Sequence, residues 1–177
     1  MQRKGMFANT MKKQRIAIVP GSFDPATKGH VDIIRRAARI FDKVYPTVMV
    51  NAEKLGSEMF TPEERLAILK SACRDLGDNI ECLMCSSLAS DFADSLGASY
   101  FVKGVRGATD FDYEYSMAEI MRRFDSRIET ILLPASPELA HISSTYARER
   151  IKYGCELSDV TDSRTAQLIR EIYGARK

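Results

Sequence analysis

Several features that define large classes of protein are missing from this sequence of 177 residues. No run of about 18 apolar residues occurs, so we expect no membrane-spanning helix and no membrane partner. The 26 basic and 24 acidic residues nearly balance and no basic run stands out, which argues against a nonspecific nucleic-acid partner. Four cysteines are too few for the disulfide framework of a small secreted protein.

The first residues also lack the marks of an export signal. Residues 1–13 are basic, but they contain neither an apolar core nor a small-residue cleavage site. We therefore expect residues 1–13 to form a flexible N-terminal extension. Residues 14–177 have the length of a single domain, which we expect to reside in the cytoplasm.

Two hydrophobic patterns alternate along this domain. Short runs rich in β-branched residues predict strands at 15–20, 43–50, 80–85, 99–103 and 129–133. Helical spacing and capping residues predict helices that begin near His30, and at 61–77, 88–96, 110–124, 144–152 and 163–172. Such alternation predicts right-handed crossovers. The expected fold is therefore a single α/β domain with a Rossmann-like, doubly wound, five-stranded parallel sheet and helices on both faces.

The loop after the first predicted strand is the most informative segment. In residues 16–30, IAIVPGSFDPATKGH, a strand ends at a Pro-Gly pair and a helix begins near His30. A loop of this kind presents free backbone N–H groups and the positive end of a helix dipole. It therefore predicts a phosphate-binding site with His30 at its edge.

Other polar residues follow later strands at the same predicted sheet edge. Lys54 follows the second strand, residues 103–106 follow the fourth and residues 141–145 follow the fifth. Ligands of doubly wound sheets bind at the carboxyl ends of the strands. We expect these hydroxyls, cations and glycines to converge on one site.

Three segments together resemble those of a known family. Residues 21–30 (GSFDPATKGH), residues 103–114 with KGVR and DFDYE, and residues 142–145 (ISST) resemble bacterial phosphopantetheine adenylyltransferase. Those enzymes belong to the nucleotidylyltransferase superfamily, whose signature is Thr/His-x-Gly-His. The resemblance runs in collinear order over roughly residues 15–153. It implies the reversible transfer of adenylyl from ATP to 4′-phosphopantetheine, which gives dephospho-coenzyme A and pyrophosphate in coenzyme A biosynthesis.

The resemblance also implies roles for individual residues. His30 would stabilise the transition state on the α-phosphate, and magnesium would arrive with ATP. The nucleotide side would comprise Ser22, Phe23, His30, Gly104, Val105, Arg106, Glu114, Leu139, Ala140, His141, Ile142, Ser143, Ser144 and Thr145. The acceptor side would comprise Ser22, Lys54, Ala89 and Lys103. Coenzyme A as a feedback ligand and a homohexameric assembly are further implications.

The sequence departs from the family pattern at a few of these positions. Lys103 stands where arginine is frequent, which keeps the charge but loses the bidentate fork for phosphate. The loop around Lys54 is about two residues longer than usual, so its register is open. Leu139 and His141 replace common aromatic residues near the adenine, and Ala89 replaces a larger apolar residue. None of these changes touches His30.

Competing interpretations remain open at this point. Residues 142–151, ISSTYARERI, also resemble nicotinamide-mononucleotide adenylyltransferase, although Thr27 stands where that family usually has histidine. A nucleotide-binding protein without catalysis is the alternative of another class. Arg106 and Lys103 could form ordinary ion pairs with Asp110 or Asp112. The DFDYE run could supply a cap and core aromatics, and Arg148 could lie on an exposed helix face.

Overall fold

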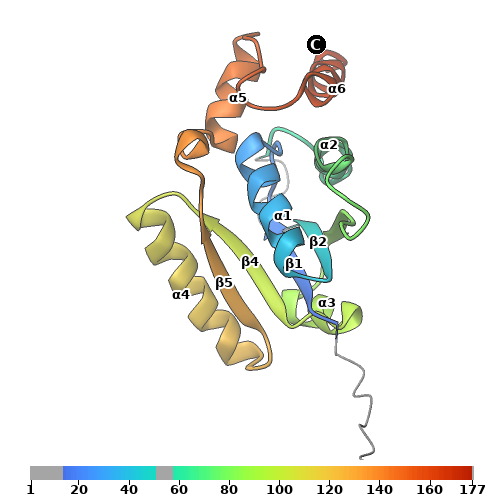
Figure 1. Ribbon diagram of the computed structural model, residues 1–177. Coiled ribbons are helices and arrows are strands. Elements are labelled where there is room, and N and C mark those ends of the chain that lie inside the picture. The colour runs from blue at the N-terminus through green and yellow to red at the C-terminus, as the bar shows by residue number, and fades with distance from the viewer. Residues whose placement is uncertain (1–13, 51–57, 177) are drawn as a thin grey trace, which may run out of the picture.

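The computed structural model describes residues 14–50 and 58–176, which form a parallel sheet covered by helices (Figure 1). The strands are β1 (Ile16–Gly21), β2 (Lys43–Met49), β3 (Leu83–Cys85), β4 (Tyr100–Val105) and β5 (Glu129–Pro134). All neighbouring strands are parallel, in the order β3-β2-β1-β4-β5. This strand order reverses direction after β3, as in a doubly wound Rossmann-like sheet, and confirms the expected fold class. The predicted extension at residues 1–13 lies outside the described residues.

Two strand boundaries differ from the prediction in ways that matter for the site. The third strand is shorter than expected, because Ile80 makes only an isolated bridge to Val44 before pairing resumes at Leu83. The fourth strand is longer, since its register with β5 continues through Lys103, Gly104 and Val105. Gly104 and Val105 are therefore strand residues, not loop residues. A strand holds their backbone more rigidly than a loop would.

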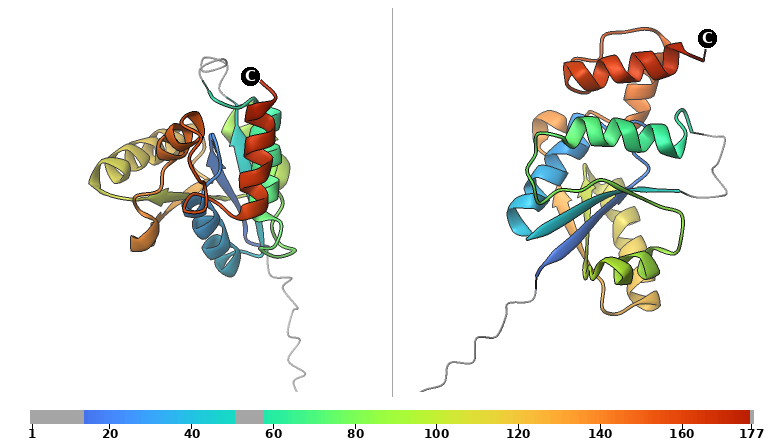
Figure 2. Two further views of the ribbon diagram at one scale, coloured as in Figure 1. Left: turned by 90° about the horizontal axis from the view of Figure 1, so that it is seen from above. Right: turned by 90° about the vertical axis from the view of Figure 1, so that its right-hand side faces the viewer.

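Four helices cover the two faces of the sheet. Side chains of α1 (Lys28–Ile40) and α2 (Pro62–Cys73) enter the larger core cluster, and those of α3 (Ala89–Leu96) enter a smaller one with Ile18 and Phe101. The long helix α4 (Ala108–Phe124) lies along β4 and β5 on the flank of the molecule (Figure 1). The last two helices are α5 (Ser144–Lys152) and α6 (Ser163–Gly174), and α6 lies beside α2 (Figure 2). A short 3₁₀ helix, η2 (Pro137–Leu139), was not predicted.

Local sequence signals explain several helix ends. Thr61 and Glu64 form the predicted capping box, with Pro62 in the first turn of α2. Gly97 ends α3 in the left-handed conformation with a φ of 64°. The α2 helix ends at Cys73, before the predicted end at Gly77. Its buried residues include Arg65, which no apolar periodicity could have indicated.

The α4 helix contradicts one sequence interpretation. The DFDYE run was a candidate source of core aromatics, but α4 has no buried residue. Phe111 is 46% and Tyr113 62% exposed. The reason is the position of α4 on the outer flank of the molecule (Figure 1). One side of α4 faces β4 and β5, and the opposite side faces away from the described part of the chain. None of the helices described is long and apolar enough to cross a membrane.

Candidate active site

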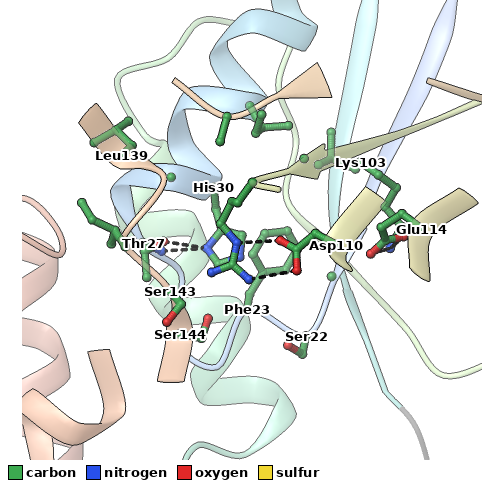
Figure 3. Close-up of a pocket in the computed structure, with 18 of the residues that line it drawn as sticks. Ser22, Phe23, Thr27, His30, Lys103, Asp110, Glu114, Leu139, Ser143 and Ser144 are labelled. Carbon is green, nitrogen blue, oxygen red and sulfur yellow. Dashed lines mark hydrogen bonds and ion pairs between the residues drawn. The ribbon is translucent and has the colours of Figure 1, made fainter. Parts of the chain in front are cut away.

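A cavity of about 540 Å³ opens at the carboxyl ends of β1 and β4. Its walls come from the loop after β1, the first turn of α1, the start of α4, and the segment that leads into α5. Figure 3 shows His30 in the middle of this cavity, with Lys103 and Glu114 on one side and Ser143 and Ser144 on the other. The convergence expected at this sheet edge is therefore present for the loops after the first, fourth and fifth strands.

Most residues predicted for the site line this cavity. They are Ser22, Phe23, His30, Lys103, Gly104, Arg106, Glu114, Leu139, Ile142, Ser143, Ser144 and Thr145. Four others are not among its lining residues: Val105, Ala140, His141 and Ala89. Lys54 lies outside the described residues, so the expected contribution of the loop after β2 stays a prediction.

His30 has one ring nitrogen occupied and the other available. The backbone N–H of Thr27 donates to His30 Nδ1 at 3.0 Å, and Thr27 Oγ1 lies at the same distance (Figure 3). Because Nδ1 accepts this N–H, the neutral ring carries its proton on Nε2. Burial, and to a lesser extent the nearby Arg106 charge, lower the pKa of His30 from 6.5 to about 4. At neutral pH His30 is therefore an uncharged hydrogen-bond donor.

The lowered pKa of His30 predicts how the free energy of unfolding depends on pH. The folded protein keeps His30 neutral while the unfolded chain takes up a proton below about pH 6.5, so stability is fully present above pH 6.5 and falls as the pH drops toward 4. Between pH 7.5 and 5 we expect a loss of about 1–2 kcal/mol in wild type that is missing in His30→Gln. Denaturant titrations of both proteins across this range measure it. Equal losses in the two proteins would contradict the assigned ionisation of His30.

Two cations of the cavity are paired with carboxylates of α4. Lys103 Nζ lies 3.1 and 3.3 Å from the two carboxylate oxygens of Glu114. Arg106 Nε donates to Asp110 Oδ2 at 2.8 Å, an interaction that Figure 3 marks. The ion-pair interpretation is thus confirmed for Arg106, whereas Lys103 pairs with Glu114 and with neither Asp110 nor Asp112. Since both pairs line the cavity, an incoming anion can take the place of Glu114 beside Lys103 or of Asp110 beside Arg106.

The start of α5 adds the predicted hydroxyl groups and one cation, Arg148, that sequence reasoning missed. Ser143 is the N-cap of α5 and its Oγ accepts from the N–H of Tyr146 at 3.0 Å. Arg148 lines the cavity, where its Nη2 donates to Thr145 Oγ1 at 3.0 Å and its Nη1 to the carbonyl of Asp24 at 2.7 Å. The interpretation of Arg148 as part of an exposed helix face is therefore wrong. Its spacing of four residues from Ser144, on one helix face, was the available signal.

Gly104 is required by a close approach of β4 to α1. A Cβ atom at this position would lie 2.8 Å from Cγ1 of Ile33, inside van der Waals contact. The missing side chain lets the first turns of α1 sit against the end of β4. This approach brings His30, on α1, next to the Lys103–Arg106 stretch.

The cavity does not offer an obvious metal cage. Among residues 14–50 and 58–176, no group of three or more His, Cys, Asp and Glu side chains is arranged to hold a metal ion. The two carboxylates that line the cavity, Asp110 and Glu114, are both engaged with cations. Hard cations such as Mg²⁺ need free oxygen ligands. Both carboxylates of the cavity are thus already paired with a cation in the described part of the chain.

Comparison with known proteins agrees with this geometry. A family model and a solved structure define the broad class of protein to which the chain belongs. The cytidylyltransferase-like family model matches residues 18–150, which include most of β1, the lining of the cavity and most of α5. A solved structure from Vibrio parahaemolyticus, provisionally named a nicotinate-nucleotide adenylyltransferase, shares the fold with a TM-score of 0.62 at 16% identity. It covers 88% of this chain and 98% of its own. The chain thus belongs to the cytidylyltransferase-like family and shares the fold of that structure.

The sequence relatives define the family within that class. The phosphopantetheine adenylyltransferase of Chloroflexus aggregans is 41% identical over 162 residues, 92% of this chain and 99% of its own length. That of Lachnoclostridium phytofermentans is 36% identical over 163 residues, with 92% and 98% covered. The chain belongs to the phosphopantetheine adenylyltransferase family.

Proposed function

We propose that this protein transfers the adenylyl group of ATP to 4′-phosphopantetheine and releases dephospho-coenzyme A and pyrophosphate. Membership in the family supports the choice of substrates. The observation that carries the chemistry is His30, a neutral donor at the N-terminus of α1, between paired cations and the N-terminus of α5.

The cavity has what a direct transfer needs. An oxygen of the acceptor phosphate attacks the α-phosphorus of ATP and pyrophosphate leaves on the opposite side. The attacking oxygen is already anionic, so the protein needs no general base, and positioning and charge stabilisation carry the catalysis. His30 Nε2–H would donate to the α-phosphate as negative charge builds up on it. The uncharged state of His30 keeps this donor present throughout the neutral pH range.

Each side of the cavity would bind one substrate. Lys103 would exchange its contact with Glu114 for the phosphate of the acceptor. Arg106 would likewise leave Asp110 for the nucleotide. The N–H groups at the start of α5, together with Thr145 and Arg148, would hold the β- and γ-phosphates.

Magnesium would enter with the triphosphate, where it offsets charge on the leaving pyrophosphate. The ion-paired state of Asp110 and Glu114 supports this assignment over a metal site built from the protein. We also propose coenzyme A as a feedback ligand, since it contains the pantetheine arm of one substrate and the adenosine of the other.

We further propose that the chain forms a homohexamer in the cytoplasm. The support for assembly is α4, a helix of 17 residues without a single buried one. Six of its large apolar side chains are at least one-third exposed, namely Phe111, Tyr113, Tyr115, Met117, Ile120 and Phe124. The cytoplasmic location is supported by the four cysteines, Cys73, Cys82, Cys85 and Cys155, which are all free thiols.

An acceptor panel tests the proposed activity. Pyrophosphate release from ATP and Mg²⁺ is followed with 4′-phosphopantetheine, with nicotinamide mononucleotide, and with no acceptor. We expect turnover with the first acceptor only. Turnover confined to nicotinamide mononucleotide would assign the chain to that branch, and binding of ATP without release with either acceptor would indicate a nucleotide-binding protein.

A further inference from the structure

Arg65 is a charged side chain buried next to the candidate active site. It is the fourth residue of α2 and its side chain is 0% exposed. Its Nη1 donates to the backbone carbonyl of Ser22 at 3.0 Å and lies 3.7 Å from Oε1 of Glu58. Among the described residues, Nε and Nη2 of Arg65 find no hydrogen-bond partner.

A buried, partly unpaired arginine contributes little to the free energy of unfolding. A buried guanidinium loses its hydration, and two nitrogens without a partner in the described part of the chain add to that loss. Apolar side chains of similar volume often replace buried ion pairs without loss of stability. The position of Arg65 is therefore better explained by what it holds than by the packing that it adds.

The loop that Arg65 contacts is fixed at two points, one on each side of Phe23. Arg65 holds the carbonyl of Ser22. Asp24, only 3% exposed, accepts the N–H groups of Met59 and Phe60, each at 2.9 Å. Between them, Phe23 adopts a φ of 48°, in the left-handed region that residues with a Cβ avoid. A residue persists in this region where its surroundings impose the conformation.

The orientation of one peptide group follows from these contacts. The Ser22–Phe23 peptide is trans, since the cis bond in this loop is Asp24–Pro25. In a trans peptide the C=O and the N–H point in opposite directions. Because the carbonyl of Ser22 points to Arg65, which does not line the cavity, the N–H of Phe23 points to the opposite side, where Ser22 and Phe23 do line it.

The same conformation also places the ring of Phe23. Its centroid lies 5.0 Å from that of His30, in an edge-to-face arrangement, and the ring is almost fully buried. Figure 3 shows the Phe23 ring beside His30. A rotation of the Ser22–Phe23 peptide would change φ of Phe23, so that both the N–H and the support of the histidine ring would move.

We propose that Arg65 is a positioning residue, which holds the Ser22–Phe23 peptide so that the N–H of Phe23 faces the phosphates of ATP and the ring of Phe23 supports His30. The identity of the ligand as ATP rests on the proposed function. The role of Arg65 rests on the contacts within the loop. Without the hydrogen bond to Ser22, the peptide is free to turn over and the strained φ of Phe23 relaxes.

The test compares two replacements at this position with a control on the same helix. Arg65→Met has a similar length but no donor, whereas Arg65→Lys keeps a charged donor that can reach the carbonyl of Ser22. Ser71→Ala removes only the contact of Ser71 Oγ with Thr165 Oγ1, between α2 and α6. We expect Arg65→Met to lower kcat about 10- to 100-fold and to weaken ATP binding, with a Tm near that of wild type. Arg65→Lys is expected to keep kcat and ATP affinity within about threefold of wild type. Ser71→Ala is expected to have the kcat and ATP affinity of wild type.

A second readout observes the peptide group itself. In protein labelled with ¹⁵N-phenylalanine, the Phe23 amide signal is expected to shift when ATP is added without acceptor. Arg65→Met should lose this shift and Arg65→Lys should keep it. If Arg65→Met does not fold, the ATP-induced shift of the Phe23 amide is compared between wild type and Arg65→Lys. We expect the shift in both proteins, and its absence from wild type would contradict the proposal.

Two outcomes would overturn the proposal. One is a folded Arg65→Met variant with kcat and ATP affinity within about twofold of wild type. The other is a Phe23 amide that does not respond to ATP in the wild-type protein. ATP binding is measured without acceptor, so a failure of phosphopantetheine as substrate would overturn the proposed function while the comparison at Arg65 still stands.

Discussion

Replacement of His30 by alanine is expected to lower kcat by roughly 10²- to 10³-fold, which is the usual loss when one donor to a developing oxyanion is removed. The Kd of ATP should change much less, because the contact of Nε2–H with the α-phosphate strengthens as charge builds up in the transition state. Pre-steady-state rates and ATP titrations of the same variant separate the two effects.

Two further variants control this experiment. His30→Asn keeps a short hydrogen-bond donor and should recover part of the lost rate. Arg39→Ala, an exposed position in the last turn of the same helix, should match wild type. A His30→Ala variant with nearly normal kcat would remove His30 from its assigned role, and an equal loss in Arg39→Ala would indicate damage to α1 instead.

Lys103 and Arg106 should have separable effects on the two substrates. Lys103→Ala is expected to raise the KM of the acceptor by about 10- to 100-fold, because a charge-assisted hydrogen bond to phosphate is lost. Arg106→Ala should do the same for ATP. Initial-rate kinetics with one substrate varied at a time measure both constants in both variants.

The carboxylate partners supply the matched controls. Glu114→Gln releases Lys103 from its ion pair, and Asp110→Asn releases Arg106. If the carboxylates compete with substrate phosphate, Asp110→Asn should lower the KM of ATP modestly. An Arg106→Ala variant that weakens only the acceptor, or a Lys103→Ala variant that weakens only ATP, would contradict the assignment of the two sides.

The fold could be predicted because its signals are local. The alternation of strands and helices, the capping box at Thr61 and the left-handed glycine at Gly97 each depend on a few neighbouring residues. The boundaries of β4 could not be predicted in this way. Gly104 and Val105 continue the strand because they pair with Leu133 and Pro134, about thirty residues further along the chain.

The candidate site shows the same division. A histidine after a glycine-containing loop is a local pattern, and His30 does line the cavity. The partners of the charged residues are not local, because they depend on how elements meet. Arg65 lies on an otherwise ordinary helix, yet it contacts Ser22, which is 43 residues away in sequence. Arg148 contacts Asp24 across 124 residues.

The exposure of α4 is a further property that periodicity could not reveal. The helix is rich in aromatic residues, as helices that pack in a core often are. In this single chain, however, Tyr113 and Phe124 are more than 60% exposed. Whether an apolar face is buried depends on what packs against it, in this chain or in another copy. Light scattering of the purified protein tests the proposed hexamer directly.

Product identification by mass spectrometry tests the central claim most directly. The protein is incubated with ATP, Mg²⁺ and 4′-phosphopantetheine, and the dephospho-coenzyme A and pyrophosphate formed are quantified against a His30→Ala control. We predict equal amounts of the two products in wild type and a rate reduced by orders of magnitude in the variant. Absence of dephospho-coenzyme A from the wild-type reaction, while nicotinamide mononucleotide is adenylated in parallel, would contradict the proposed function.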